Sequence, residues 1–158
     1  MYDIIIIGTG SAGLPAAMYA ARYRLKTLAI GNLPGGALGT SHCVENYPAI
    51  LSAPGGEIME KMMEHARVSG AELMQDEVGS VEKTATGFIV KTISGQSFEC
   101  KFVLLATGNK YRRLGIPGEN EYLGKGVSYC ATCDGNFCKN RKVVLVGGGD
   151  TAATEALY

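Results

Sequence analysis

Two cysteines and an aspartate late in the chain have residue types and a spacing that can do chemistry. Cys130 and Cys133 form a Cys-x-x-Cys pair, and Asp134 follows directly. Such a pair can bind zinc, cross-link a small secreted domain, or transfer electrons by opening and closing a disulfide. Redox exchange needs one thiolate that attacks and a second thiol that resolves. Asp134 could then move the proton that this exchange creates.

The other possible metal ligands are few and scattered. A structural zinc site needs four ligands at ordered spacing. Cys138 offers a third sulfur, but the chain has no second cysteine pair, and the remaining candidates are distant in sequence: Cys43, Cys100, His42 and His65. We therefore predict no metal site. The three cysteines outside the pair are interpreted as small buried residues or, for Cys138, as an exposed thiol.

The composition is that of a folded domain with no strongly charged partner. The 158 residues are 46% hydrophobic, which is enough for a buried core. Basic and acidic residues both number 15, so the formal net charge is +0, and we expect no capture of nucleic acid or of an anionic membrane. The apolar run 4–7 is too short to span a bilayer and no secretory leader accompanies it. We expect a cytoplasmic protein, in which a cysteine pair is more often redox-active or metal-binding than structural.

A glycine-rich turn near the start of the chain has the form of a dinucleotide-binding motif. The sequence Gly8-Thr-Gly10-Ser-Ala-Gly13 follows an apolar run at 3–7 and precedes a helix pattern. Gly8 allows a tight turn, Gly10 lets the backbone approach a pyrophosphate, and Gly13 lets helix and strand pack closely. The N-terminus of the helix faces the phosphates. This context predicts a dinucleotide site rather than a merely structural glycine turn.

The first motif departs from the usual pattern in one respect. An acidic residue about twenty positions further on normally binds the ribose. Here the second apolar run, 26–30, ends in Gly31-Asn32. We expect Asn32, or a backbone group, to take that role.

A second glycine turn lies near the end of the chain. Gly147-Gly148-Gly149-Asp150-Thr151-Ala152 follows the apolar run KVVLV and opens another helix pattern. Two dinucleotide motifs in one chain indicate two nucleotides with electron transfer between them. The alternative is a repeated structural unit.

The periodicity of the apolar residues predicts the elements that position these motifs. We expect buried strands over 3–7, 26–30 and 102–108, with helices beginning near Ser11 and Gly55. Between 77 and 101 apolar and polar residues alternate around glycine turns, which predicts a three-stranded antiparallel meander.

The sequence around the cysteine pair has its own pattern. The glycine-rich segment 114–126 reads as a linker. The pair is expected to precede a basic turn, 139–142, and a strand over 142–146. In the thioredoxin fold, by contrast, such a pair opens a helix. That difference favours a different redox protein.

With these motifs in order, the whole chain resembles the low-molecular-weight thioredoxin reductases of the flavin disulfide reductase class. GTGSAG (8–13) is similar to their FAD fingerprint, and GGALGTSHCVENYPA (35–49) to their GGQL…VENxPG segment. LLATG (104–108) is similar to the strand end beside the flavin. GVSYCATCDG (126–135) resembles their redox motif, and VGGGDTAATEAL (146–157) their nicotinamide-dinucleotide motif.

The resemblance implies a fold and a domain organisation. The expected fold class is α/β: a Rossmann-like FAD-binding domain with a parallel sheet plus an antiparallel β-meander, followed by the start of a second Rossmann-like NAD(P)-binding domain. The FAD-binding domain would cover 1–113 without its C-terminal closing segment. A hinge would cover 114–126, and 127–158 would begin the NAD(P)-binding domain with the redox pair. In full-length form the family implies a homodimer.

The resemblance also implies a reaction and roles for single residues. NADPH, or NADH, reduces FAD, and the flavin reduces the disulfide between Cys130 and Cys133. Cys133 would be nearest the flavin, Cys130 would attack thioredoxin or a similar protein, and Asp134 would be the general acid. The implied FAD contacts are Gly8, Gly10, Ser11, Ala12, Gly13, Asn32, Gly35, Gly36, Ala37, Asn46, Val78, Ala106, Thr107 and Gly108. The implied contacts with the nicotinamide nucleotide are Gly147, Gly148, Gly149, Asp150 and Thr151.

Three features depart from the family pattern. Ala37 stands where the family usually has a glutamine, Ala49 replaces a glycine, and family members are considerably longer. We therefore expect an N-terminal piece of a reductase that binds FAD weakly and NADPH negligibly, and that associates or depends on the missing half. Two alternatives are a flavin-dependent dithiol oxidase that uses oxygen, and a nucleotide-binding fragment without turnover.

Overall fold

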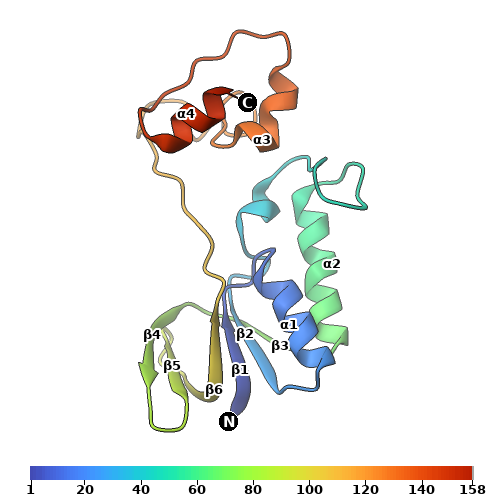
Figure 1. Ribbon diagram of the computed structural model, residues 1–158, viewed down its shortest axis with the longest axis vertical. Helices are drawn as coiled ribbons and strands as arrows, with labels where there is room; N and C mark the ends of the chain where they lie inside the picture. The colour runs from blue at the N-terminus through green and yellow to red at the C-terminus, as the bar shows by residue number, and fades with distance from the viewer. Residues whose placement is uncertain (158) are drawn as a thin grey trace. The chain divides into compact units, whose positions relative to one another are not determined.

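A six-stranded mixed sheet forms the framework of the first compact unit, residues 1–43 and 53–109 (Figure 1). The computed structural model describes residues 1–157. The strands stand in the order β3-β2-β1-β6-β5-β4. Parallel pairing joins β3, β2, β1 and β6, and antiparallel pairing joins β6, β5 and β4. This confirms the predicted α/β class with a parallel core and an antiparallel meander. The strands are β1 (Tyr2–Ile7), β2 (Thr27–Gly31), β3 (Glu72–Gln75), β4 (Val78–Lys83), β5 (Phe88–Thr92) and β6 (Ser97–Leu105).

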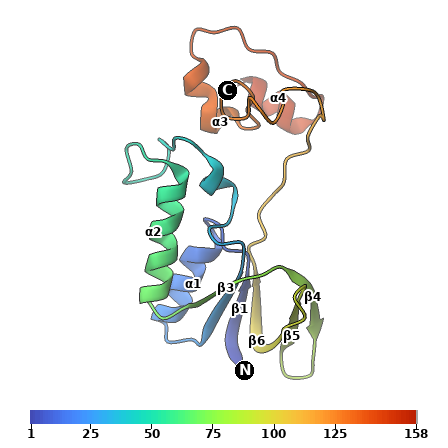
Figure 2. The same cartoon turned by 180° about the vertical axis from the view of Figure 1, so that it is seen from behind.

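The apolar run of β1 is central in the sheet, with strands on both sides, and both of its faces are covered: Ile6 by the helices, and Ile5 and Ile7 by residues of the meander. Ile5 pairs with Leu28 of β2 and with Val103 of β6. Two helices, α1 (Gly13–Arg22) and α2 (Gly55–Val68), lie side by side next to the sheet (Figures 1 and 2). They pack onto Ile6 and Ala29 through small residues of α1 and through Met59 of α2. The apolar side of α2, which includes Met59, Met63 and Ala66, is therefore part of the core.

One predicted strand boundary is wrong. The last strand of the meander and the strand predicted over 102–108 are a single strand, β6, and its end is not buried as predicted, since Phe102 and Leu105 are exposed. Its first part pairs antiparallel to β5, from Lys91↔Ser97 to Phe88↔Cys100. The remainder pairs parallel to β1 as far as Ile7↔Leu105. Cys100 takes part in both pairings, and β6 contains no glycine or proline, so nothing in its sequence breaks the strand.

The short edge strand β3 was not predicted. Its four residues follow α2 directly and pair with β2, as in Ala29↔Leu73. Four residues are too few for an alternating pattern to be recognised. The long segment between β2 and α2 contains one short 3₁₀ helix, Ala37–Thr40.

The second compact unit comprises residues 44–52 and the chain from 110 onward. It contains the short helix α3 (Ala131–Asp134), a 3₁₀ turn (Gly135–Cys138) and α4 (Asp150–Leu157). The predicted strand 142–146 is wrong: these residues form no strand, and Val144 is 86% exposed. A strand needs a neighbour for its backbone hydrogen bonds, and the described residues from 110 to 157 contain no sheet.

The expectation that the cysteine pair does not open a helix is also wrong. Cys130 is the N-cap residue of α3, so the pair does open a helix, although a short one. None of the helices within residues 1–157 has the length and apolarity needed to cross a membrane.

Candidate functional site

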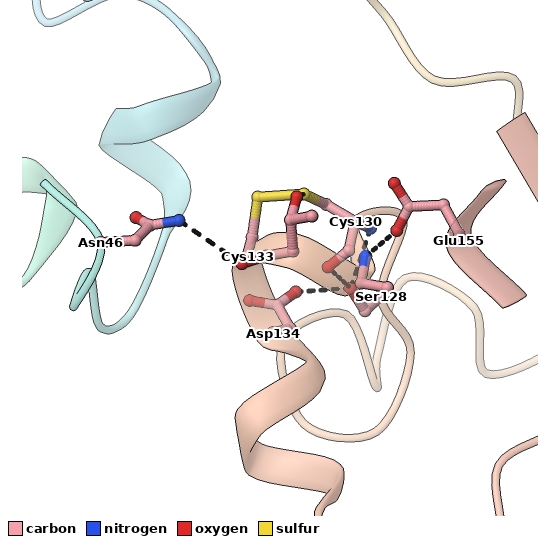
Figure 3. Close-up of a disulfide and its surroundings, with 8 residues drawn as sticks. Asn46, Ser128, Cys130, Cys133, Asp134 and Glu155 are labelled. Atoms are coloured by element: carbon pink, nitrogen blue, oxygen red, sulfur yellow. Dashed lines mark hydrogen bonds between the residues drawn. A yellow bond between two sulfur atoms is a disulfide. The ribbon is translucent and has the colours of Figure 1, made fainter. Parts of the chain in front are cut away.

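Cys130 and Cys133 are joined in a disulfide (Figure 3). The S–S distance is 2.14 Å and the two Cα atoms lie 5.3 Å apart. Cys130 has extended backbone dihedrals, φ −149° and ψ 104°, and the chain then turns into α3. One helical turn thus brings the two sulfurs together. The two cysteines are therefore close enough to form a disulfide with each other, as a redox-active pair must.

Asp134 is tied to the disulfide through Ser128, a residue that the sequence analysis missed. The Ser128 hydroxyl donates to Oδ2 of Asp134 at 2.5 Å and accepts the N–H of Cys130 at 3.1 Å (Figure 3). A serine hydroxyl that bonds the backbone N–H two residues on is a common local turn. Ser-x-Cys was therefore a usable signal. The carboxylate predicted to move protons is thereby held beside the cysteine pair.

Two further side chains contact the backbone of the redox motif (Figure 3). The side-chain amide of Asn46 donates to the carbonyl of Thr132 at 3.5 Å, a long hydrogen bond. Glu155 of α4 accepts a hydrogen bond from the N–H of Ala131, the first residue of α3. The structure thus places Asn46 beside the redox motif and ties α4, which follows the second glycine turn, to the same motif.

A buried carboxylate anchors the residues before the cysteine pair. Glu119 is 5% exposed and accepts the N–H groups of Leu114 and Gly115 at 2.9 and 2.7 Å. It also accepts a hydrogen bond from the hydroxyl of Tyr129. The ring of Tyr129 stacks on that of Tyr111, with the ring centroids 5.2 Å apart. The hydrogen bond from Tyr129, followed by those from the backbone, holds the pKa of Glu119 below its ordinary value near 4.5. The same bond raises the pKa of Tyr129.

We predict that Glu119→Gln removes a pH-dependent stabilisation of this segment. Because the folded pKa of Glu119 is lowered, its contribution is fully present above the unfolded pKa and is lost as the pH falls through the folded pKa. Amide hydrogen exchange of Leu114 and Gly115, corrected for intrinsic rates, should be about tenfold faster in the variant at neutral pH. The exposed neighbour Glu121→Gln is the control. Equal protection in parent and Glu119→Gln at neutral pH would contradict this assignment, because the two should converge only below the folded pKa of Glu119.

The cysteines outside the pair differ in burial. Cys100 is 1% exposed, and burial raises the pKa of its thiol. Since the thiolate is the reactive form, Cys100 is a core residue rather than a nucleophile, as predicted. Cys43 and Cys138 are half-buried, in the first and the second unit respectively.

The first glycine motif lies in the first unit, at the carboxyl ends of β1 and β6. Gly8 has φ +111°, and a Cβ built on it would lie 2.1 Å from the carbonyl oxygen of Ala106. A Cβ on Gly13 would lie 1.8 Å from the carbonyl oxygen of Gly8. Only glycine permits this approach of three backbone segments. The predicted cofactor residues of the first motif therefore meet those that follow β6.

The turn after β2 completes this group. Gly36 has φ +84°, and a Cβ on it would lie 2.7 Å from Cα of Gly10. We refer to 8–13, 35–36 and 106–108 together as the glycine cradle. The contacts between these segments are largely between backbone atoms, and a side chain at Gly8, Gly13 or Gly36 would clash with them. Helix α1 begins at Gly13. Glycine-rich backbone gathered at the N-terminus of a helix fits the pyrophosphate of a dinucleotide such as FAD.

The remaining predicted cofactor residues lie in several places. Asn32 follows β2, Ala37 begins the 3₁₀ helix beyond the cradle, and Val78 begins β4, where it packs against a core cluster. The second glycine turn lies in the second unit, and α4 follows it as predicted. No strand precedes this glycine turn within the described residues of the second unit. The structure therefore assembles the first predicted nucleotide site more completely than the second.

Comparison with known proteins agrees with the glycine cradle and with the disulfide of the cysteine pair. A family model described as pyridine nucleotide-disulphide oxidoreductase matches residues 2–158. The chain is 44% identical over 159 residues to a thioredoxin reductase of Bacillus subtilis, covering 100% of this chain and 50% of the relative. It is 46% identical over 158 residues to a thioredoxin reductase of Treponema pallidum, covering 99% and 51%. The crystal structure of thioredoxin reductase from Streptococcus pyogenes matches with a TM-score of 0.94 and 43% identity, covering 100% of this chain and 52% of that one.

The matches confirm the resemblance seen in the motifs and define its extent. The chain spans about half the length of the curated relatives it matches. The family model covers nearly every residue, including the glycine cradle and the cysteine pair. The chain belongs to the pyridine nucleotide-disulphide oxidoreductase family and is a homologue of the N-terminal half of thioredoxin reductases.

Proposed function

We propose that this chain is the cofactor-binding and disulfide-bearing part of an NAD(P)H-dependent, FAD-containing reductase of thioredoxin or a similar small protein. The observation that carries the proposal is the Cys130–Cys133 disulfide with Asp134 held next to it by Ser128. Membership of a family that depends on FAD and NAD(P)H, together with a glycine cradle that fits a pyrophosphate, supplies the source of the electrons.

The glycine cradle, which includes Ser11 and Ala12, would hold FAD. Ala37 at its border and Asn32, Asn46 and Val78 are further proposed contacts. When bound, FAD would relay an electron pair from the nicotinamide nucleotide to the disulfide. Backbone N–H groups at the start of α1 would bind the phosphates. The turn Gly147–Thr151 would hold the nicotinamide nucleotide.

The two cysteines carry the exchange with the protein substrate. The Cys130 thiolate attacks one sulfur of the substrate disulfide; that S–S bond breaks and a mixed disulfide forms. Cys133 then attacks the sulfur of Cys130, which restores the disulfide and releases the substrate as a dithiol. Two electrons and two protons have then passed to the substrate. Asp134 carries a proton to or from the cysteine pair, as the family resemblance implies.

The domain organisation belongs to the same proposal. Residues 1–113 would be the FAD-binding domain, 114–126 a hinge, and 127–158 the start of the NAD(P)-binding domain. The relatives' remaining length would supply neighbouring strands for the exposed run 142–146. We propose a homodimer for the full-length enzyme.

Two other functions give different outcomes in one experiment. A flavin-dependent dithiol oxidase would take electrons from a dithiol and pass them to oxygen. A nucleotide-binding module would bind flavin without turnover. The second glycine turn counts against the oxidase, since that reaction needs no nicotinamide nucleotide.

The flavin absorbance of the protein separates the three functions. The sample joins residues 1–158 to the C-terminal half of the Bacillus subtilis relative, so that residues 142–146 can find neighbouring strands. We expect bound flavin that NADPH bleaches without oxygen and that oxidised thioredoxin restores. Bleaching by a dithiol but not by NADPH would identify an oxidase. Flavin that neither donor bleaches would leave a nucleotide-binding module.

A further inference from the structure

Thr9 lies between the first two glycines of the motif, and its side chain is buried. It is 2% exposed, and its hydroxyl donates to the carbonyl of Asn32 at 2.5 Å. The bond joins the turn after β1 to the turn after β2, 23 residues further along the chain. A buried hydroxyl with a single backbone partner in another turn fixes the position of that turn.

The second turn is wrapped closely around this hydroxyl. A Cβ on Gly31 would lie 2.6 Å from Oγ1 of Thr9. A Cβ on Gly35 would lie 2.6 Å from the same oxygen and 2.5 Å from the carbonyl oxygen of Asn32. The Thr9 side chain therefore occupies the space that side chains at both positions would need.

The same packing brings Gly36 against Gly10. Their backbones approach until a Cβ on Gly36 would lie 2.7 Å from Cα of Gly10, and the reverse contact would be 3.3 Å. These two glycines are the point at which two segments of the glycine cradle touch. This contact lies next to the Thr9–Asn32 hydrogen bond, which joins the same two turns.

We infer that Thr9 is a positioning residue for the cofactor: its hydroxyl holds the turn 32–36 against the first glycine turn and so fixes the width of the glycine cradle. The inference rests on the proposed function, in which the cradle holds FAD. The Thr9 hydroxyl takes up one of the two lone pairs of the Asn32 carbonyl, and the Asn32 side chain and N–H are the other groups that a ribose contact could use.

The first test compares Thr9→Val, which replaces the hydroxyl with a methyl group, with Thr9→Ser, which keeps the hydroxyl. The matched control is Thr27→Val. Thr27 is 1% exposed and its hydroxyl donates to the carbonyl of Leu25 at 2.9 Å, at the other end of β2. Without flavin, amide exchange over residues 33–37 should be about tenfold faster in Thr9→Val, and unchanged in Thr9→Ser and Thr27→Val. Unchanged exchange in Thr9→Val would overturn the inference.

The second readout is the affinity for FAD, measured by quenching of flavin fluorescence. We expect a dissociation constant about tenfold higher in Thr9→Val, with parent values in Thr9→Ser and Thr27→Val. A loosened turn with unchanged affinity would show a structural role only and would overturn the positioning role. If the parent protein bound no FAD, the proposed function would be contradicted. The amide exchange measurement would then still decide whether Thr9 fixes the turn 32–36. If Thr9→Val does not fold, Thr9→Cys, a weak donor, replaces it with the same criteria.

Discussion

Gly10→Val is expected to abolish FAD binding. A Cβ at this position would already lie 3.3 Å from Cα of Gly36, closer than ordinary contacts. The two additional methyl groups must displace Gly36 or fill the space into which a pyrophosphate would bind. We expect a loss of at least about a hundredfold in affinity, which corresponds to about 2.7 kcal/mol. Flavin fluorescence titration of parent and variant measures it.

Gly79→Val is the matched control for this substitution. Gly79 lies in β4, where a Cβ would meet only ordinary contacts, the nearest being 3.6 Å from Ile93. Valine is favoured in strands, so this variant should fold and bind FAD like the parent. If Gly10→Val purified with as much flavin as Gly79→Val, the glycine cradle would not be the cofactor site.

Cys133→Ser and Cys130→Ser are both expected to abolish thioredoxin reduction, but in different ways. In the enzyme completed with the C-terminal half of the Bacillus subtilis relative, each should lower turnover by at least about a thousandfold, because neither retains a disulfide to be reduced. Cys133→Ser keeps the attacking Cys130 without its resolving partner. It should therefore accumulate a mixed disulfide with thioredoxin, visible on a non-reducing gel, whereas Cys130→Ser should not.

The control for the cysteine variants is Cys138→Ser. Cys138 is half-buried in the same segment and lies outside the disulfide, so the substitution should leave turnover close to that of the parent. A mixed disulfide that formed only in Cys130→Ser would reverse the two roles. Loss of activity in Cys138→Ser comparable to that in the other two variants would show a third essential thiol.

The sequence predicts best those features that depend on local pattern. Within the run at 3–7, Ile5, Ile6 and Ile7 are buried in β1, because a continuous β-branched run suits a central parallel strand. The stripe of α2 faces the core because its apolar residues recur with the helical period. The Cys-x-x-Cys spacing allowed the disulfide, since one helical turn separates its two ends.

The failures involve contacts between distant residues. Whether 142–146 forms a strand depends on a neighbouring strand, which the local sequence does not specify. β6 continues through a change of period because its pairing partner changes from β5 to β1 midway. Thr9 and Glu119 find partners 23 and 10 residues away, respectively, so their hydrogen bonds follow from tertiary structure and leave no mark in a linear motif.

The central claim is that electrons from NADPH reach the Cys130–Cys133 disulfide, and mass spectrometry of alkylated thiols tests it most directly. The completed enzyme is treated anaerobically with one equivalent of NADPH, and free thiols are then labelled with iodoacetamide. We predict new labels on both Cys130 and Cys133, and none on Cys100, whose burial raises the pKa of its thiol. An intact Cys130–Cys133 disulfide after complete oxidation of the NADPH would contradict the account.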